Sequence, residues 1–460
     1  MTSLLLERAW VDGSVQDDVL VEIEDGRFTA VEVRARVANF EGRASDTEFA
    51  VPRSAGGSER PSERLPGLTI PGMANCHSHA FHRALRGRTQ RERGSFWTWR
   101  DQMYDVAGRL DPDGYFELAR ATYREMAAAG ITSVGEFHYL HHQPDGSPYD
   151  DPNAMGRALV AAAREAGIRI TLLDTCYLSS GFGEPPEGVQ ARYSDGDAAA
   201  WAERVTDLAA ETTDPGVVIG AAAHSVRAVP AEQLPTVAEW AGGQKPLHVH
   251  LSEQLVENRA CMAAYSRTPA EVLALHGVLG PMTSAVHATH LTDGDIRLLG
   301  TTGTHACFCP TTERDLGDGV GPSRRLHVAG APLTLGSDSH AIVDLFEEMR
   351  AVELDERLAT QLRGHWSAAE LLAAATTHGH RSLGWDDAGA IAVGQRADLV
   401  TVDVTSARTA GTGRDEGTVV FAAAAEDVTQ VMVDGRIVVQ QGDREEIGHE
   451  LDQAIGKMWQ

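Results

Sequence analysis

Short apolar runs alternate with alanine-rich amphipathic segments from Leu68 onward. A repeat near two residues marks strands and one near 3.6 marks helices, so the alternation predicts successive βα units. The eight strand candidates are LTIPGMANCHSH, ITSVGEFHY, IRITLLDTCY, VVIGAAAHS, PLHVHLSE, SAVHATH, GTHACFCP and PLTLGSDS. Eight such units in succession predict an α/β fold with a TIM-like (β/α)8 barrel over residues 70–385.

Helix starts between these strands are marked by capping signals. Thr268 precedes a proline and is followed three residues later by Glu271, and Ser367 is followed in the same way by Glu370. In both segments the side chains can satisfy backbone N–H groups of the first turn. These signals support helices between the strands.

Both ends of the chain carry a different pattern. LLLERAWVDGSV, DVLVEIEDGRFTAVEV and VTQVMVDGRIVVQQG each hold Asp-Gly between apolar-alternating runs, a hairpin signature, and AGAIAVGQRADLVTVDV is similar. We therefore predict a small composite β-sandwich domain from residues 1–69 and 386–460. Residues 42–66 are rich in Gly, Ser, Pro and charge, which predicts an exposed loop.

Composition and charge exclude several classes of function for this protein. A formal net charge of −26 does not suit nucleic acid or an anionic membrane surface. No window of about 18 apolar residues is present, so we expect no membrane span. The five cysteines are odd in number and scattered, which argues against a disulfide scaffold. These features predict a globular cytoplasmic protein.

Ionisable side chains gather where the predicted strands end. Strand one ends in His77 and His79, whose spacing places both imidazoles on one strand face. Four further strands end in EFHY, HSVR, HVHLSE and HATH, and the eighth ends in GSDS with Asp338. Barrel active sites lie at these strand ends, and a core rarely buries so many ionisable groups. The pattern predicts a metal-binding active site.

The order H-x-H, HVHLSE, HATH and GSDS resembles the amidohydrolase superfamily, especially its mononuclear-zinc, cytosine-deaminase-like branch. The segment GAIAVGQRADLV resembles the strand pair that follows the barrel in that superfamily. The combination of HSHAF, SFWTWRDQMY, EFHYLHH, HSVRAV and HVHLSEQ is most similar to the formimidoylglutamate deiminases of histidine degradation. The resemblance covers nearly the whole chain.

The resemblance implies one zinc per chain. The ligands that it implies are His77, His79, His250 and Asp338, a set that suits a catalytic zinc. Binuclear relatives use a modified lysine at the end of strand four, and VVIGAAAHSVR has none. Fe²⁺ is the alternative metal. We expect His248 to be a packing residue.

The resemblance also implies a mechanism. Zinc-activated hydroxide would attack an amidine carbon. Glu253 matches the proton shuttle, His287 matches the histidine that holds the hydroxide, and Asp338 accepts a proton from water. His290 is interpreted as structural. The implied reaction converts N-formimidoyl-L-glutamate and water to N-formyl-L-glutamate and ammonia.

The implied substrate is a small dicarboxylate, which requires local positive charge. Arginine supplies it through paired hydrogen bonds. The implied substrate-binding residues are His82, Arg100, Tyr139, His224 and Arg227. His82 departs from the family, in which glutamine follows HSHAF, and leaves the details of substrate binding open. The resemblance further implies a homodimer.

Two other functions stay open from the sequence. One is a different mononuclear zinc aminohydrolase acting on a guanidine, pterin or purine; the paired arginines and Tyr139 argue against a neutral heterocycle. The other is a barrel that has lost catalysis and serves as a binding protein. The presence of all four ligand positions with Glu253 and His287 disfavours that second alternative.

Overall fold

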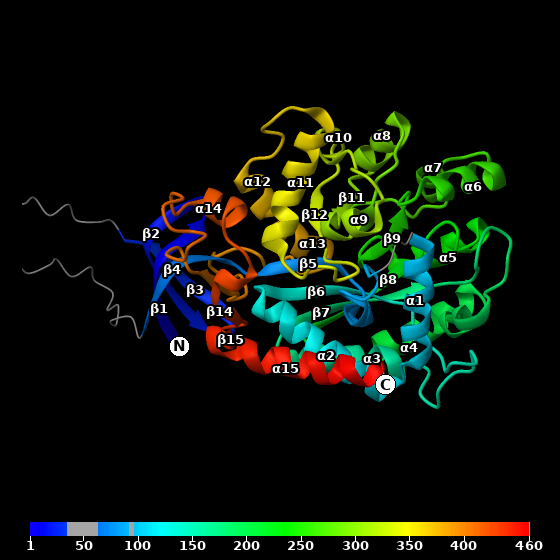
Figure 1. Ribbon diagram of the computed structural model, residues 1–460, viewed down its shortest axis with the longest axis horizontal. Coiled ribbons are helices and arrows are strands. Elements are labelled where there is room, and N and C mark those ends of the chain that lie inside the picture. The colour runs from blue at the N-terminus through cyan, green and yellow to red at the C-terminus, as the bar shows by residue number, and fades with distance from the viewer. Residues whose placement is uncertain (35–62, 92–95, 460) are drawn as a thin grey trace, which may run out of the picture.

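Eight parallel strands form the barrel that the sequence predicts (Figure 1). The computed structural model describes residues 1–34, 63–91 and 96–459. The neighbours within the sheet follow chain order from β5 to β12. The barrel strands are β5 (Met73–Ser78), β6 (Ile131–His138), β7 (Arg169–Cys176), β8 (Val217–Ala223), β9 (Leu247–Leu251), β10 (Thr283–His287), β11 (His305–Phe308) and β12 (Leu333–Leu335).

The first and last barrel strands meet at the residues that carry the predicted ligands. The backbone N–H of Asp338 donates to the carbonyl of His77 at 2.9 Å, and that of His79 donates to the carbonyl of Asp338 at 3.3 Å. An isolated parallel bridge also joins Ser78 to Asp338. The closure of the barrel therefore brings His77 and His79, at the end of the first strand, next to Asp338, which follows the last strand.

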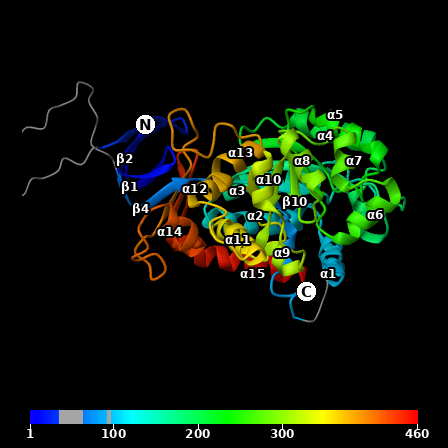
Figure 2. The same cartoon turned by 90° about the horizontal axis from the view of Figure 1, so that it is seen from above.

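Helices surround these strands, as Figures 1 and 2 show from two directions. Both predicted capping boxes are present, at Thr268 and at Ser367. The helices up to α13 are α1 (Phe96–Arg109), α2 (Pro112–Ala128), α3 (Ala154–Ala166), α4 (Ala198–Glu211), α5 (Leu234–Ala241), α6 (Leu255–Tyr265), α7 (Pro269–Leu275), α8 (Asp293–Thr302), α9 (Pro310–Leu316), α10 (Ser323–Ala329), α11 (Leu345–Thr360), α12 (Ala368–Ala373) and α13 (Gly379–Ser382). Every one of these helices, and every other described helix, is too short or too polar to span a bilayer.

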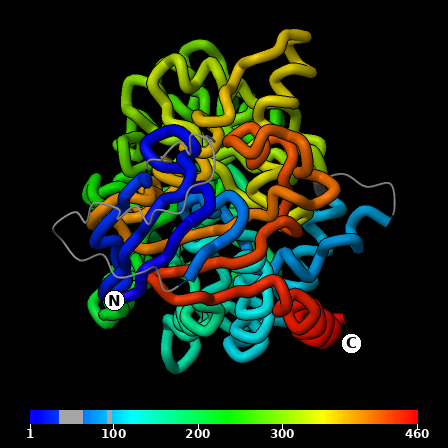
Figure 3. Tube along the Cα trace, turned by 90° about the vertical axis from the view of Figure 1, so that its left-hand side faces the viewer, coloured from blue at the N-terminus to red at the C-terminus, as the bar shows by residue number. Residues whose placement is uncertain are grey.

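The two ends of the chain share a separate seven-stranded mixed sheet, in which N-terminal strands lie beside C-terminal ones (Figure 3). Its order is β15-β14-β13-β4-β1-β2-β3. The three predicted Asp-Gly turns are present, with positive φ at both turn residues, as tight hairpins require. The strands are β1 (Thr2–Val11), β2 (Ser14–Glu24), β3 (Arg27–Val33), β4 (Glu63–Pro71), β13 (Leu399–Val402), β14 (Val428–Val433) and β15 (Arg436–Gln440).

The predicted first barrel strand is divided between the two sheets. β4 ends at Pro71 in the small sheet, and β5 begins at Met73 in the barrel. A Cβ at Gly72 would lie 2.3 Å from the Thr132 hydroxyl oxygen and 2.8 Å from Asp398 Cβ. Only glycine fits this crossing without displacing its neighbours, so the sheets come into direct contact here.

Two segments near the C-terminus differ from the strand-rich pattern. Residues 389–397 form turns and bends with one isolated antiparallel bridge, between Arg396 and Arg27, and Leu399–Val402 pairs as a strand. α14 (Glu416–Phe421) follows, and α15 (Arg444–Met458) packs along α2 on the barrel, with Arg124 paired to Glu450 and Lys457 to Glu117 (Figure 1). The predicted loop 42–66 lies outside the described residues up to residue 62, and its last residues belong to β4.

Candidate active site

A buried carboxylate holds the turn that follows β5. Glu136 on β6 accepts from the Ser78 hydroxyl at 2.6 Å and from the Ala80 backbone N–H at 2.7 Å. Burial raises the pKa of Glu136 to about 7, and these hydrogen bonds oppose the rise. The hydrogen bonds to Ser78 and Ala80 fix the backbone on both sides of His79.

Backbone carbonyls set the tautomers of two predicted ligands. Nδ1 of His79 lies 3.0 Å from the carbonyl of Phe137, and Nδ1 of His250 lies 2.9 Å from the carbonyl of His224. A carbonyl can only accept, so both Nδ1 atoms carry the hydrogen and both Nε2 atoms keep a lone pair. This arrangement is typical of metal-binding histidines.

These lone pairs converge with a third histidine and a carboxylate. The Nε2 atoms of His77 and His250 lie 3.1 Å apart, and Asp338 Oδ1 lies 3.4 Å from Nε2 of both His77 and His79. All four side chains are buried or nearly so. Burial, reinforced by neighbouring imidazoles, lowers the pKa of the three histidines well below the ordinary value, so they stay neutral. Crowded lone pairs and a carboxylate fit a divalent metal.

His287 lies beside this cluster at the end of β10. Its backbone has φ 67°, and the next residue, Ala288, has φ 47°. Two successive left-handed residues without glycine are strained, and such strain clusters at functional sites. Nε2 of His287 lies 3.7 Å from Asp338 Oδ2 and 3.9 Å from Glu253 Oε1. Its imidazole stacks on that of His250, with ring centroids 5.6 Å apart.

Carboxylates surround His287 and control its charge. Burial alone would lower its pKa, but Glu253, Glu313 and Asp338 outweigh burial and raise that pKa well above the ordinary value. Burial raises the pKa of Glu253, with His287 opposing and Asp338 reinforcing the rise. Perturbed acids and bases in contact within one cleft are characteristic of proton-transfer sites.

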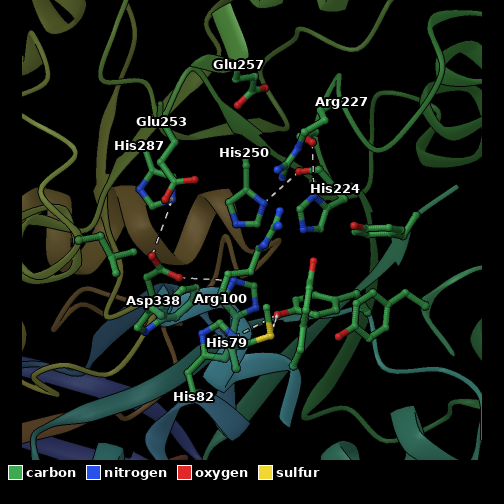
Figure 4. Close-up of a pocket in the computed structure, with 18 residues that line it drawn as sticks. His79, His82, Arg100, His224, Arg227, His250, Glu253, Glu257, His287 and Asp338 are labelled. Carbon is green, nitrogen blue, oxygen red and sulfur yellow. Dashed lines mark hydrogen bonds and ion pairs between the residues drawn. The ribbon is translucent and has the colours of Figure 1, made fainter. Parts of the chain in front are cut away.

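A pocket opens over this cluster and contains the predicted substrate-binding side chains (Figure 4). His82 Nε2 lies 3.0 Å from the Tyr139 hydroxyl. Burial lowers the pKa of His82 well below its ordinary value, so this imidazole is neutral. The lining residues that the sequence predicts are His79, His82, Arg100, Tyr139, His224, Arg227, His250, Glu253, His287 and Asp338.

The structure thus brings the predicted site residues together. His77 lies beneath the pocket, wholly buried, and contributes through the ligand cluster. His248 is also wholly buried, and neither it nor His290 lines the pocket. Both were expected to have structural roles.

Several functional candidates escaped the sequence reasoning. Glu257 lines the pocket from the first turn of α6, four residues after Glu253, which precedes that helix, and Tyr104 lines it one turn after Arg100 on α1. The i,i+4 spacing on one helix was an available signal for Tyr104. Tyr177 directly follows β7, so its place at the end of the strand candidate IRITLLDTCY was an available signal. The other missed residues have no such signal, because they come from segments without a regular pattern or act from behind the pocket wall: Gln190, Tyr193 and Glu313.

The chain matches known proteins along most of its length. The Amidohydrolase family profile matches residues 68–438. Formimidoylglutamate deiminase of Pseudomonas aeruginosa is 36% identical over 83% of this chain and 86% of its own length. The 8-oxoguanine deaminase of the same organism is 28% identical over 80% of this chain and 81% of its own.

Solved structures show the same fold. An amidohydrolase from Brucella melitensis superposes with a TM-score of 0.86 at 29% identity and covers 100% of both chains. An adenosine deaminase from Xanthomonas campestris with bound zinc has a TM-score of 0.82 at 23% identity over 99% of this chain and 98% of its own.

Hydrolytic deaminases recur among these relatives, and the pocket described above holds a metal-binding donor set beside perturbed acids and bases. This chain belongs to the amidohydrolase family, as a hydrolase acting on carbon–nitrogen bonds.

Proposed function

We propose that this protein hydrolyses N-formimidoyl-L-glutamate to N-formyl-L-glutamate and ammonia, with one zinc ion per chain. The 36% identity to the Pseudomonas aeruginosa formimidoylglutamate deiminase supports this assignment, as does the pocket chemistry. A relative named for 8-oxoguanine is less similar, at 28% identity.

The observation that carries the proposal is the pairing of two guanidinium groups with the ligand cluster in one pocket. Arg100 and Arg227 line the same pocket as His79 and His250 (Figure 4). The Nε of Arg227 is buried and has no hydrogen-bond partner among the described residues. A substrate with two carboxylates brings negative charge to both cations, whereas a neutral heterocycle brings none and would leave Arg227 Nε without a charged partner.

His77, His79, His250 and Asp338 would hold the metal. When bound, a zinc ion lowers the pKa of a coordinated water to about 7 and so makes hydroxide available at neutral pH. The positions of His287 Nε2 and Asp338 Oδ2, 3.7 Å apart, suit His287 to hold a water and Asp338 to accept its proton. Glu253 Oε1, 3.9 Å from the same imidazole nitrogen, would carry a proton to the leaving nitrogen.

The reaction balances with water alone. Water supplies the oxygen of the formyl group, and the bond from the formimidoyl carbon to its terminal nitrogen breaks. Both protons of the water end on that nitrogen, which leaves as ammonia. Burial of Glu253 raises its pKa, which favours the protonated form that this transfer requires.

An ammonia-release assay with a panel of substrates tests the proposal. The panel contains N-formimidoyl-L-glutamate, N-formimidoyl-L-aspartate, a guanidino acid, guanine and 8-oxoguanine. We expect turnover of the first compound with the highest kcat/KM. Turnover of a heterocycle without turnover of the first compound would overturn the assignment, and a Glu253→Gln variant controls for contaminating activity.

A further inference from the structure

A glutamine behind the pocket wall has its amide orientation fixed by the backbone. Gln190 Oε1 accepts from the backbone N–H of Glu187 at 3.0 Å. That N–H can only donate, so the amide oxygen must face Glu187 and the amide nitrogen must face the opposite way. Gln190 Nε2 there lies 2.9 Å from the hydroxyl of Tyr104 and 2.9 Å from that of Tyr177.

This orientation determines the direction of both phenolic hydrogen bonds. The amide nitrogen of Gln190 donates one hydrogen to each of the two hydroxyl oxygens, which act as acceptors. Neither Tyr104 nor Tyr177 can donate its own proton to that nitrogen. Even where one phenol donates to the other, one phenolic proton is left for another acceptor. Both tyrosines line the pocket, so the acceptor can be a bound molecule.

These donors lie on the side of the pocket remote from the metal ligands. The Tyr177 ring packs against His224 with centroids 4.7 Å apart, and His224 packs against the ligand His250 at 5.0 Å. His224 therefore separates Tyr177 from the ligand cluster. The guanidinium carbon of Arg100 lies 5.4 Å from the Tyr104 ring centroid. The phenolic donors and this cation border the same part of the pocket.

The tyrosine hydroxyl remains a neutral donor in this setting. Burial raises the pKa of Tyr177, while the positive charges of Arg227 and Arg100 oppose the rise. A protonated phenol beside two guanidinium groups favours an acceptor that carries negative charge.

We propose that Tyr104, Tyr177 and Gln190 form a donor cluster that binds the substrate carboxylate farthest from the reacting carbon and thereby selects acidic substrates. The proposal rests on the proposed function, because it assigns one end of that substrate. Tyr104 and Tyr177 are the contacting residues, and Gln190 positions them.

Paired substrates separate recognition from stability. N-formimidoyl-L-glutamate is compared with N-formimidoyl-L-norvaline, in which a methyl group replaces the distal carboxylate. Gln190→Glu keeps an acceptor for the Glu187 N–H but places a second acceptor against the phenols, so their protons turn away from the pocket. Tyr177→Phe removes one donor without adding charge.

For both variants we expect kcat/KM for the glutamate compound to fall about tenfold or more, chiefly through KM. The norvaline compound should change less than about twofold, because it lacks the acceptor. Tyr265→Phe is the matched control, because its hydroxyl accepts the Ala231 backbone N–H away from the pocket and should be neutral for both compounds.

Each outcome decides between the proposals. Equal losses for both compounds in both variants, or no loss in Tyr177→Phe, would overturn the donor cluster while leaving the proposed function intact. Absence of wild-type turnover of the glutamate compound would overturn the proposed function and the cluster with it. Thermal unfolding of Gln190→Glu shows whether this variant has a folding defect. If it has, the kinetics of Tyr177→Phe and Tyr104→Phe test the donor cluster instead.

Discussion

Glu313 Oε1 lies 3.4 Å from Nδ1 of His287 and also accepts the backbone N–H of Cys309 at 2.9 Å. The backbone contact fixes the carboxylate, and the carboxylate in turn orients the imidazole. Nδ1 therefore holds a hydrogen toward Glu313, while Nε2 faces Glu253 and Asp338. This relationship makes Glu313 a positioning residue for proton transfer.

Glu313→Gln should lower kcat about 10- to 100-fold, because the imidazole loses its charged partner while the side-chain shape is kept. The metal content should be unchanged, since Glu313 does not belong to the donor set of His77, His79, His250 and Asp338. Steady-state kinetics and elemental analysis of the same preparation check both expectations.

The matched control for this change is Glu347→Gln, whose carboxylate forms an ion pair with Arg314 at the surface. It should keep wild-type kcat, because exposed ion pairs contribute little. An unchanged kcat in Glu313→Gln, or a loss explained by missing metal, would refute the positioning role.

Arg227→Ala should raise KM for the dicarboxylate about 10- to 100-fold with a smaller effect on kcat, since a charge-assisted hydrogen bond to substrate is lost. Michaelis–Menten analysis separates the two constants. Arg408→Ala is the control, because its guanidinium pairs with Asp427 at the surface of the small sheet. A KM equal to that of the wild type would place Arg227 outside substrate binding.

His82→Gln should keep activity within about threefold of the wild type. Burial lowers the pKa of His82, so it acts as a neutral hydrogen-bonding group toward Tyr139, and a glutamine amide can do the same. The profile of kcat/KM between about pH 5.5 and 8 should have the same shape in both proteins. A pH dependence that disappears in the variant would show that His82 titrates during catalysis.

Glu257 should make substrate binding weaken at alkaline pH. Burial raises its pKa to about 7, Arg227 opposes the rise and Glu253 reinforces it. Below that pH the carboxyl is neutral; above it, a negative charge beside Arg227 competes with the substrate carboxylate. KM should therefore rise as pH increases through 7 and stay flatter in Glu257→Gln. The same rise in the variant would assign the effect to another group.

The fold was predictable because the hydrophobic periodicity and the helix-capping signals indicated the same elements. Eight strand candidates gave eight barrel strands, and capping boxes at Thr268 and Ser367 started helices. The division at Gly72 was not predictable, because it depends on the approach of Thr132 and Asp398 from distant parts of the chain. The turns at 389–397 were not predictable either, because their backbone contacts are made with residues 26–28 at the other end of the chain, including the single bridge between Arg396 and Arg27.

The candidate site was predictable where strand ends carry the chemistry. The strand-end pattern predicted where the site lies, because barrel closure places all strand ends on one rim, and the resemblance supplied His77, His79, His250 and Asp338 as its ligands. Glu313 and Gln190 were not found, because each acts through another side chain across the fold. Such contacts depend on distances that no local spacing encodes.

The most direct test of the central claim is the product balance from N-formimidoyl-L-glutamate with zinc-loaded enzyme. We expect equimolar ammonia and N-formyl-L-glutamate, measured by an ammonia assay and by ¹H NMR of the formyl proton, with activity lost on metal removal and restored by zinc. Formation of glutamate and formamide, or no products at all, would contradict it.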